Sequence, residues 1–372
     1  MFRRCLVAGF KTVAARGLAT FGAVLLLFAM ALSPARADAD FSGETLHVLT
    51  WPDYIEPEVI DEFEKRFNAR ITFSYFETDD ARSEILTKSE GQGYDVVLVG
   101  GHDIRKYQRR GWLAPLVADA VPNRGHIMQR WAEAFPGALE YGVAYFWGTQ
   151  GIAYRRDLVS RPITSWRQLL DPNEELRGRI AMTGTARDLT GIALKSLGYS
   201  LNSSEIPQLK EAETLLRRQL PYVKSYAYIN LSQKSELVRG EVWAAMVFNG
   251  DALMLQQYND QIAYAVPEEG ANLWVDYFCV LEASPRKELS HVFLNFLNEP
   301  EIAARIASYV YYATPNQAAR DHLPQSYFDN PIIYPPAAQL SRSEFYESLT
   351  PRAQKYTNGI MARLLNEHVA SR

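Results

Sequence analysis

The sequence is poor in the residues that cross-link a fold or carry catalysis. It has 372 residues, of which two are cysteines, Cys5 and Cys279, and six are histidines. Cys5 falls in an N-terminal segment that we expect to be removed, so the mature chain cannot form an intrachain disulfide bond and must depend on a buried core. Cys279 stands inside the apolar run YFCVL, which is typical of core packing rather than of a nucleophile.

Catalytic and metal-binding motifs are missing from the sequence as well. It contains no G-x-S-x-G, no P-loop, no H-E-x-x-H and no C-x-x-C. No two histidines are three or four residues apart, so a metal site on one helix face has no support. We therefore predict that the protein is not an enzyme and has no cofactor; the alternative is an enzyme that has adopted a binding fold.

The N-terminus has the pattern of a secretory leader. Residues 1–17 carry four basic side chains and no acidic one, and residues 18–32 form an apolar run. Ala35 and Ala37 supply the small residues that a signal peptidase reads, so we predict a signal peptide over residues 1–37 and export to the periplasm. The alternative is an uncleaved membrane anchor, but the run is shorter than the roughly twenty residues of a spanning helix.

Net charge and chain length limit the possible partners and the number of domains. Removing residues 1–37 takes away five basic side chains and no acidic one, which changes the formal charge from −4 to −9. An acidic chain lacks the basic patches that nucleic acid requires, so we predict no nucleic-acid partner. The remaining length is too great for one compact core and suits two domains.

The pattern of apolar residues predicts an α/β fold. Residues 45–50, 70–75 and 95–99 read as strands, and the stretches between them, 58–67 and 80–90, read as helices. This order predicts a parallel sheet covered by helices, with ligands bound beyond the carboxyl ends of the strands.

Two long extended segments, residues 141–154 and 262–281, predict crossings between lobes. We therefore expect a two-lobed periplasmic binding protein fold of type II, with the ligand cleft between lobes that are joined by hinge crossings. The expected first lobe is 44–148 plus 276–314, and the expected second lobe is 149–275 plus 315–372.

Acids stand beside aromatic residues in three segments that follow or form predicted strands: Trp51-Pro52-Asp53-Tyr54, Phe248-Asn249-Gly250-Asp251 and Trp274-Val275-Asp276-Tyr277. A carboxylate next to a flat ring is the pairing that an alkylammonium ion needs. Each segment also has a simpler interpretation: a helix cap at Asp53, a turn at Asn249-Gly250-Asp251, and interface packing at Trp274. The residues alone predict a cation site without identifying the cation.

Eight segments carry a family resemblance: TWPDYI (50–55), YDVVLVGG (94–101), YFWGTQGIAYRRD (145–157), TSWRQLL (164–170), TARDLTGIALKSLGYS (185–200), GEVWAAMVFNGDA (240–252), WVDYF (274–278) and YATPNQAAR (312–320). In their order and spacing, from about residue 44 to 319, the chain resembles the spermidine/putrescine-binding proteins of bacterial ABC transporters. The resemblance implies a hinged two-lobed fold in which aromatic rings enclose a polyamine and acids bind its amino groups.

The resemblance also assigns residues by position. It implies that Trp51 and Tyr54 are walls of the first lobe and that Asp53 accepts an amine. Thr185 occupies a position where spermidine-type members have an aspartate, and the loop after Val99 reads GGHD where a serine or threonine followed by tyrosines is usual. The remaining site residues that it implies are Asp188, Phe248 in place of the usual tryptophan, Asp251, Trp274, Asp276 and Tyr312.

The function that we predict is capture of a putrescine- or spermidine-like polyamine and its delivery to an inner-membrane ABC permease. The alternative is a polyamine sensor that reports to a membrane signalling protein. The cleft residues would be much the same in both, so the sequence does not separate them.

Overall fold

The computed structural model describes residues 39–370, and the predicted signal peptide lies outside them. The N-terminal part alternates strands and helices as predicted: β1 (Thr45–Thr50), α1 (Pro57–Phe67), β2 (Arg70–Tyr75), α2 (Asp79–Lys88) and β3 (Val96–Gly100). The helix α1 buries Val59, Phe63 and Phe67, which are four residues apart and lie on one face. β1 pairs in parallel with β2 and with β3, so the predicted parallel sheet is confirmed.

The rest of the chain continues the α/β pattern. Its helices are α3 (Gly101–Arg109), α4 (Gln129–Ala132), α5 (Ala138–Tyr141), α6 (Trp166–Leu170), α7 (Ala186–Ser196), α8 (Ile206–Gln219), α9 (Asn249–Gln256), α10 (Lys287–Leu297), α11 (Pro300–Val310), α12 (Gln325–Phe328), α13 (Ala337–Leu340) and α14 (Pro351–Ala370). Its strands are β4 (Gly142–Arg155), β5 (Ile180–Met182), β6 (Val223–Tyr226), β7 (Ala244–Phe248), β8 (Ile262–Ala265), β9 (Asn272–Val280) and β10 (Glu344–Phe345).

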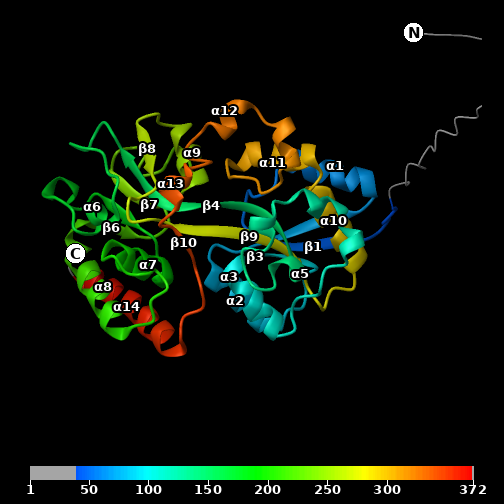
Figure 1. Ribbon diagram of the computed structural model, residues 1–372, viewed down its shortest axis with the longest axis horizontal. Helices are drawn as coiled ribbons and strands as arrows, with labels where there is room; N and C mark the ends of the chain where they lie inside the picture. Colours follow the sequence, from blue (N-terminus) through cyan, green and yellow to red (C-terminus); the bar gives the residue numbers. More distant parts are fainter. Residues whose placement is uncertain (1–38, 371–372) are drawn as a thin grey trace, which may run out of the picture. The chain divides into compact units, whose positions relative to one another are not determined.

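Two long antiparallel strands, β4 and β9, connect the two halves of the sheet (Figure 1). The sheet order is β2-β1-β3-β9-β4-β7-β5-β6, with β8 paired to β4 and β10 paired to β9. The predicted crossing at 141–154 is confirmed as β4. The second predicted crossing, 262–281, is wrong as one segment, because β8 ends at Ala265 and β9 begins at Asn272.

The buried hydrophobic residues form separate cores on the two sides of this connection. One core gathers buried residues from 41–147 and 275–333 together with Leu253. The other side has two clusters, one on each face of the sheet, because alternate residues of a strand point to opposite faces: Met246 joins one cluster and Val247 the other. This arrangement is the two-lobed α/β fold that the sequence predicts.

The chain returns to the first core late. Ala319, Leu323, Tyr327 and Ile333 pack there, although residues 315–372 were expected in the second lobe. Near the end of the chain, α14 packs on α7 and α8 of the second lobe (Figure 1). The residue boundaries of the lobes stay a prediction.

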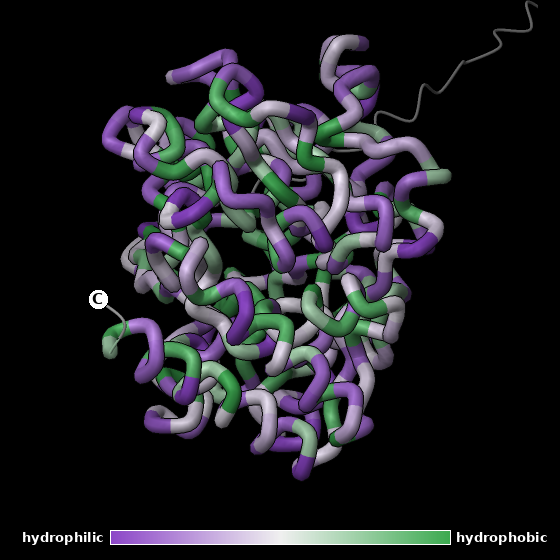
Figure 2. Tube along the Cα trace, turned by 90° about the vertical axis from the view of Figure 1, so that its left-hand side faces the viewer, coloured by the Kyte–Doolittle hydropathy of each residue, from purple (hydrophilic) through white to green (hydrophobic). Residues whose placement is uncertain are grey.

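Hydrophilic residues predominate on the outer turns of the chain, and hydrophobic stretches run through its interior (Figure 2). Within residues 39–370, no helix has both the length and the apolar composition that a membrane span requires.

Candidate functional site

The first acid of the site, Asp276, lies on β9 beside the end of β3, where it pairs in register with Gly100. Tyr54, from the loop after β1, donates its hydroxyl to Asp276 Oδ2 over 3.0 Å. Burial and, after it, the negative charge of Asp79 raise the pKa of Asp276 to about 7. The carboxyl group is therefore held where its ionised form lacks full compensation.

The second acid, Asp251, stands in the first turn of α9, directly after β7. Its side chain is 7% exposed. The Tyr312 hydroxyl donates to Oδ1 over 2.7 Å, and the Tyr228 hydroxyl donates to Oδ2. Burial raises the pKa of Asp251 to about 6, although both hydrogen bonds favour the ionised form.

The third acid, Asp188, stands in the first turn of α7, which follows β5 after the short loop 183–185. The Tyr346 hydroxyl donates to Oδ1 over 2.9 Å. Burial raises the pKa of Asp188 to about 6, while hydrogen bonds from Tyr346 and Gln150 act in the opposite direction. Two of the three acids thus follow parallel strands of the second lobe, where such sheets bind ligands.

Aromatic rings connect these acids. The ring centroids of Tyr54 and Tyr312 are 5.9 Å apart, those of Tyr312 and Trp274 are 4.8 Å apart, and those of Trp274 and Phe248 are 5.9 Å apart. Each pair is edge-to-face. The Tyr54 hydroxyl donates to Asp276, and the Tyr312 hydroxyl donates to Asp251. Because the two tyrosine rings are in contact, both acids belong to one wall with Trp274.

Within residues 39–370, the three other predicted residues form no hydrogen bond or ring contact with this wall. Trp51 packs edge-on against Phe76, with ring centroids 4.5 Å apart. Asp53 has a left-handed backbone (φ 54°) and an exposed side chain, which turns it outward while Tyr54 turns inward. Thr185 precedes α7, and its backbone N–H bonds to the Thr183 hydroxyl. The ligand roles assigned to these three residues, like those of the other predicted site residues, stay predictions.

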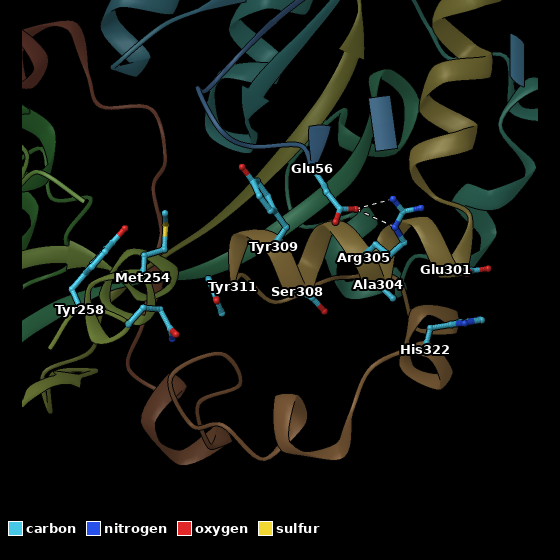
Figure 3. A pocket seen from close by; sticks show the side chains of 11 residues that line it. Glu56, Met254, Tyr258, Glu301, Ala304, Arg305, Ser308, Tyr309, Tyr311 and His322 are labelled. Carbon is cyan, nitrogen blue, oxygen red and sulfur yellow. Dashed lines mark hydrogen bonds and ion pairs between the residues drawn. The ribbon is translucent and has the colours of Figure 1, made fainter. Parts of the chain in front are cut away.

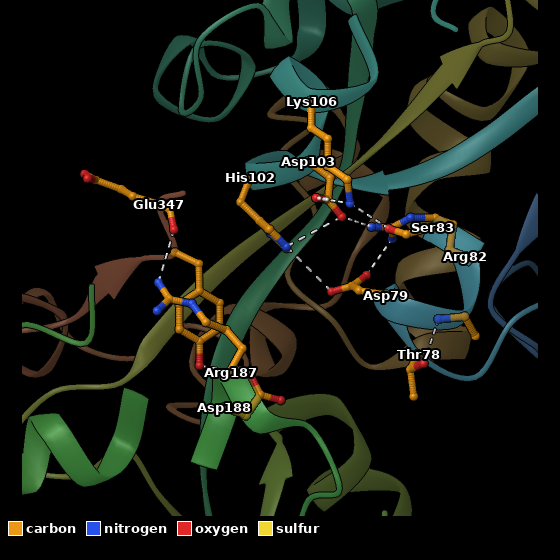
Figure 4. A network of polar contacts seen from close by, with 12 residues as sticks. Thr78, Asp79, Arg82, Ser83, His102, Asp103, Lys106, Arg187, Asp188 and Glu347 are labelled. Carbon is orange, nitrogen blue, oxygen red and sulfur yellow. Dashed lines mark hydrogen bonds and ion pairs between the residues drawn. The ribbon is translucent and has the colours of Figure 1, made fainter. Parts of the chain in front are cut away.

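A network of charged side chains that the sequence reasoning missed lies on the first lobe (Figure 4), and the charges of Asp79 and Arg82 in it act on Asp276. Arg82 is fully buried and pairs with Asp79 over 2.5 Å and with Asp103 over 2.6 Å. His102 Nε2 lies 3.9 Å from Asp79 and 3.8 Å from Asp103. His102 and Asp103 are the second half of the unusual GGHD loop, which was the one signal in the sequence that pointed here.

This network faces the second lobe. The His102 ring lies edge-on to Tyr346, with centroids 6.2 Å apart, and Tyr346 donates to Asp188. The charge of Asp79 raises the pKa of Asp188 as well as that of Asp276, after the larger effect of burial. The charge of Asp79 therefore acts on both acids, while the charge of Arg82 opposes it at Asp276 and that of Arg187 opposes it at Asp188.

A pocket of about 690 Å³ lies between α9 and α11 (Figure 3). Met254 of α9 and Tyr258, just beyond the end of α9, line one side, and Arg305 and Tyr309 line it from α11. None of the three acids lines this pocket, so we do not identify it as the cation site. The pocket and the candidate cation site share α9, because Met254 of the pocket lies three residues after Asp251 in the sequence.

The comparisons with known proteins agree with this geometry. The family model described as bacterial extracellular solute-binding protein matches residues 58–334. The chain belongs to this family. Among curated solute-binding relatives, the norspermidine sensor of Vibrio cholerae is 30% identical over 302 residues, which cover 81% of this chain and 83% of the relative.

Two further comparisons give the same fold. The spermidine/putrescine-binding periplasmic protein of Escherichia coli is 26% identical over 330 residues, covering 88% of this chain and 93% of the relative. The solved substrate-binding protein of a spermidine/putrescine ABC transporter from Streptococcus pneumoniae superposes with a TM-score of 0.76 at 26% identity, covering 87% of this chain and 99% of that one. The family is one of solute-binding proteins and not of enzymes.

Proposed function

We propose that this solute-binding protein captures a polyamine and delivers it to an ABC permease of the inner membrane. The observation that carries the proposal is that Asp188, Asp251 and Asp276 have raised pKa values and that, within residues 39–370, no lysine or arginine forms an ion pair with any of them. Buried carboxylates without a cation are unfavourable, so a ligand with several ammonium groups would supply the missing charges.

The aromatic wall supports a linear cation in particular. The faces and edges of Trp274, Tyr312 and Phe248 offer contact to methylene groups, and ring faces attract an ammonium group by about 0.5–2 kcal/mol. Acids at the ends of an aromatic surface suit charges that are separated by methylene groups. A compact inorganic cation would leave these rings without a partner.

Acids on both lobes couple binding to closure. Asp276 belongs to the connecting strand β9, and Asp188 and Asp251 begin helices of the second lobe. A ligand that bridges them interacts fully only in the closed form, so binding shifts the population towards that form. The permease would then recognise the closed form, in the periplasm where the curated transport relatives act.

Sensing is the second candidate, because the relative from Vibrio cholerae is a norspermidine sensor. The ligand chemistry would be the same and only the membrane partner would differ. Genes for a permease and an ATPase next to this gene favour uptake, and a gene for a membrane signalling protein favours sensing.

Isothermal titration calorimetry of the mature chain tests the ligand class. We expect putrescine, spermidine or norspermidine to bind with one-to-one stoichiometry. Lysine is a matched control, because its carboxylate would face the acids of the site, and we expect it not to bind. Binding of lysine without binding of any of the three polyamines would overturn the proposal.

A further inference from the structure

Two amide side chains that no comparison assigns lie on the cleft-side face of the connecting strands. Gln150 of β4 is directly opposite Asn272 of β9, and on its other side directly opposite Phe248 of β7. Residues directly opposite one another on antiparallel strands project from the same face, with Cβ atoms about 5 Å apart. Trp274 and Asp276 follow Asn272 at alternate positions of β9, so they share this face.

Both amides are buried and incompletely bonded. Gln150 is 1% exposed and Asn272 is 4% exposed. Within residues 39–370, neither Gln150 Oε1 nor Asn272 Oδ1 accepts a hydrogen bond. An unsatisfied buried acceptor is unfavourable, and most such atoms in native proteins have a partner. Two of them in one cross-strand pair indicate that a donor binds there.

Asp188 completes the group. The Gln150 side chain acts on Asp188 as a hydrogen-bond donor, and this effect lowers the pKa of the acid. The Tyr346 hydroxyl occupies one oxygen of Asp188, Oδ1. Asp188, the Gln150 carbonyl and the Asn272 carbonyl therefore supply three acceptors, and within residues 39–370 neither carbonyl oxygen has a donor.

We propose that Asp188, Gln150 and Asn272 form a subsite for the primary ammonium group at one end of the polyamine. A primary ammonium group has three N–H donors, and the subsite offers three acceptors at one place. This inference rests on the proposed polyamine function, and it specifies that the terminal ammonium group of the ligand is what these three residues recognise. Asp251 differs from this subsite, because tyrosine hydroxyls already bond to both of its oxygens.

The inference predicts selectivity for the number of N–H donors. Tetramethylputrescine keeps both charges of putrescine but has one N–H on each nitrogen. We expect the unaltered protein to bind it much more weakly than putrescine. If the Gln150 and Asn272 amides bind the additional N–H groups of putrescine, replacing these amides must lower the affinity for putrescine. It must also reduce the difference in affinity between putrescine and tetramethylputrescine.

The experiment titrates Gln150→Met and Asn272→Leu with putrescine and tetramethylputrescine by calorimetry. Each variant keeps similar side-chain bulk and loses the acceptor. We expect about tenfold or greater loss of putrescine affinity, since hydrogen bonds to charged groups contribute on that scale, and a smaller penalty for methylation. Spermidine or norspermidine with its own permethylated analogue replaces this pair if it binds more tightly than putrescine.

Gln219→Met is the matched control. Gln219 is also fully buried in the second lobe with an unbonded Oε1, but its amide nitrogen donates to the Leu169 carbonyl, within the hydrophobic core of that lobe. We expect this variant to keep both the putrescine affinity and the discrimination. Melting temperatures show whether each variant folds. If Gln150→Met does not fold, the Asn272→Leu variant alone tests the subsite.

The outcomes separate the two proposals. If the unaltered protein binds none of putrescine, spermidine and norspermidine, the proposed function fails. If it binds one of them and the folded Gln150→Met and Asn272→Leu variants keep the same affinity and discrimination, the polyamine function stands and the subsite is refuted.

Discussion

Replacing Asp276 by asparagine should make the empty protein more stable and the ligand complex weaker. Asparagine has nearly the shape of aspartate and keeps an oxygen that accepts the hydroxyl of Tyr54. What the change removes is a negative charge that burial disfavours, as the raised pKa of Asp276 indicates. A residue with a purely structural role would lose stability instead.

The magnitude follows from linkage between pKa and folding. The pKa of Asp276 is about 7 in the folded protein against an ordinary value of 3.8. Because it is raised, its contribution to stability is fully present below the unfolded pKa and is lost as the pH rises through about 7. At pH 8 the ionised group therefore costs up to about 4 kcal/mol, which Asp276→Asn would recover. At pH 4 the gain should vanish.

Urea denaturation of the empty protein at pH 4 and pH 8 measures the stability change, and calorimetry at pH 8 measures binding. We expect Asp276→Asn to weaken polyamine binding by about 30-fold to several thousand-fold, since an ammonium group loses its carboxylate. Asp61→Asn, on the exposed side of α1, should change neither quantity. An Asp276→Asn protein that is less stable at pH 8 and binds normally would refute the reasoning.

Three further changes test other parts of the site. Tyr312→Phe removes a hydrogen bond that favours ionised Asp251, so polyamine affinity by calorimetry should fall about tenfold at pH 6 and less at pH 8; an equal fall at both would contradict the assigned role. Trp274→Ala should weaken binding at least about tenfold, and Trp274→Phe should restore part of it; unchanged affinity would remove Trp274 from the site. Arg82→Met should lower the free energy of unfolding by about 3–5 kcal/mol in urea, because two acids lose their buried partner, and adding Asp103→Asn should recover part of that loss; no recovery would contradict the pairing.

Regular patterns made much of the fold predictable. The alternating β1 and the four-residue spacing of Val59, Phe63 and Phe67 on α1 identify elements from local sequence alone. The two-residue strand β10 could not be found in this way, because only its pairing with β9 makes it a strand. The break between β8 and β9 was missed although residues 267–270 (PEEG), which are typical of a turn, stand between the two strands.

The three acids of the candidate site are among the residues that the sequence singles out as ligand-binding, and their role stays a prediction; their surroundings could not be predicted. Asp251 and Asp276 stand beside aromatic residues in the sequence, and this is a visible signal. Tyr228 and Tyr346, which donate to two of the acids, come from distant segments without any motif. Asp53 was predicted as an amine ligand from its sequence position. Its left-handed backbone, which turns its side chain away from that of Tyr54, could not be predicted from the sequence.

Proton release on ligand binding tests the central claim, that three acids with raised pKa values bind a polyamine. At pH 6 Asp276 holds most of a proton, and Asp188 and Asp251 hold about half of one each, so binding should release up to about two protons. Calorimetry with putrescine, spermidine or norspermidine in buffers of different ionisation enthalpy counts them. We expect this release at pH 6 and almost none at pH 9. Binding at pH 6 without proton release would contradict the account.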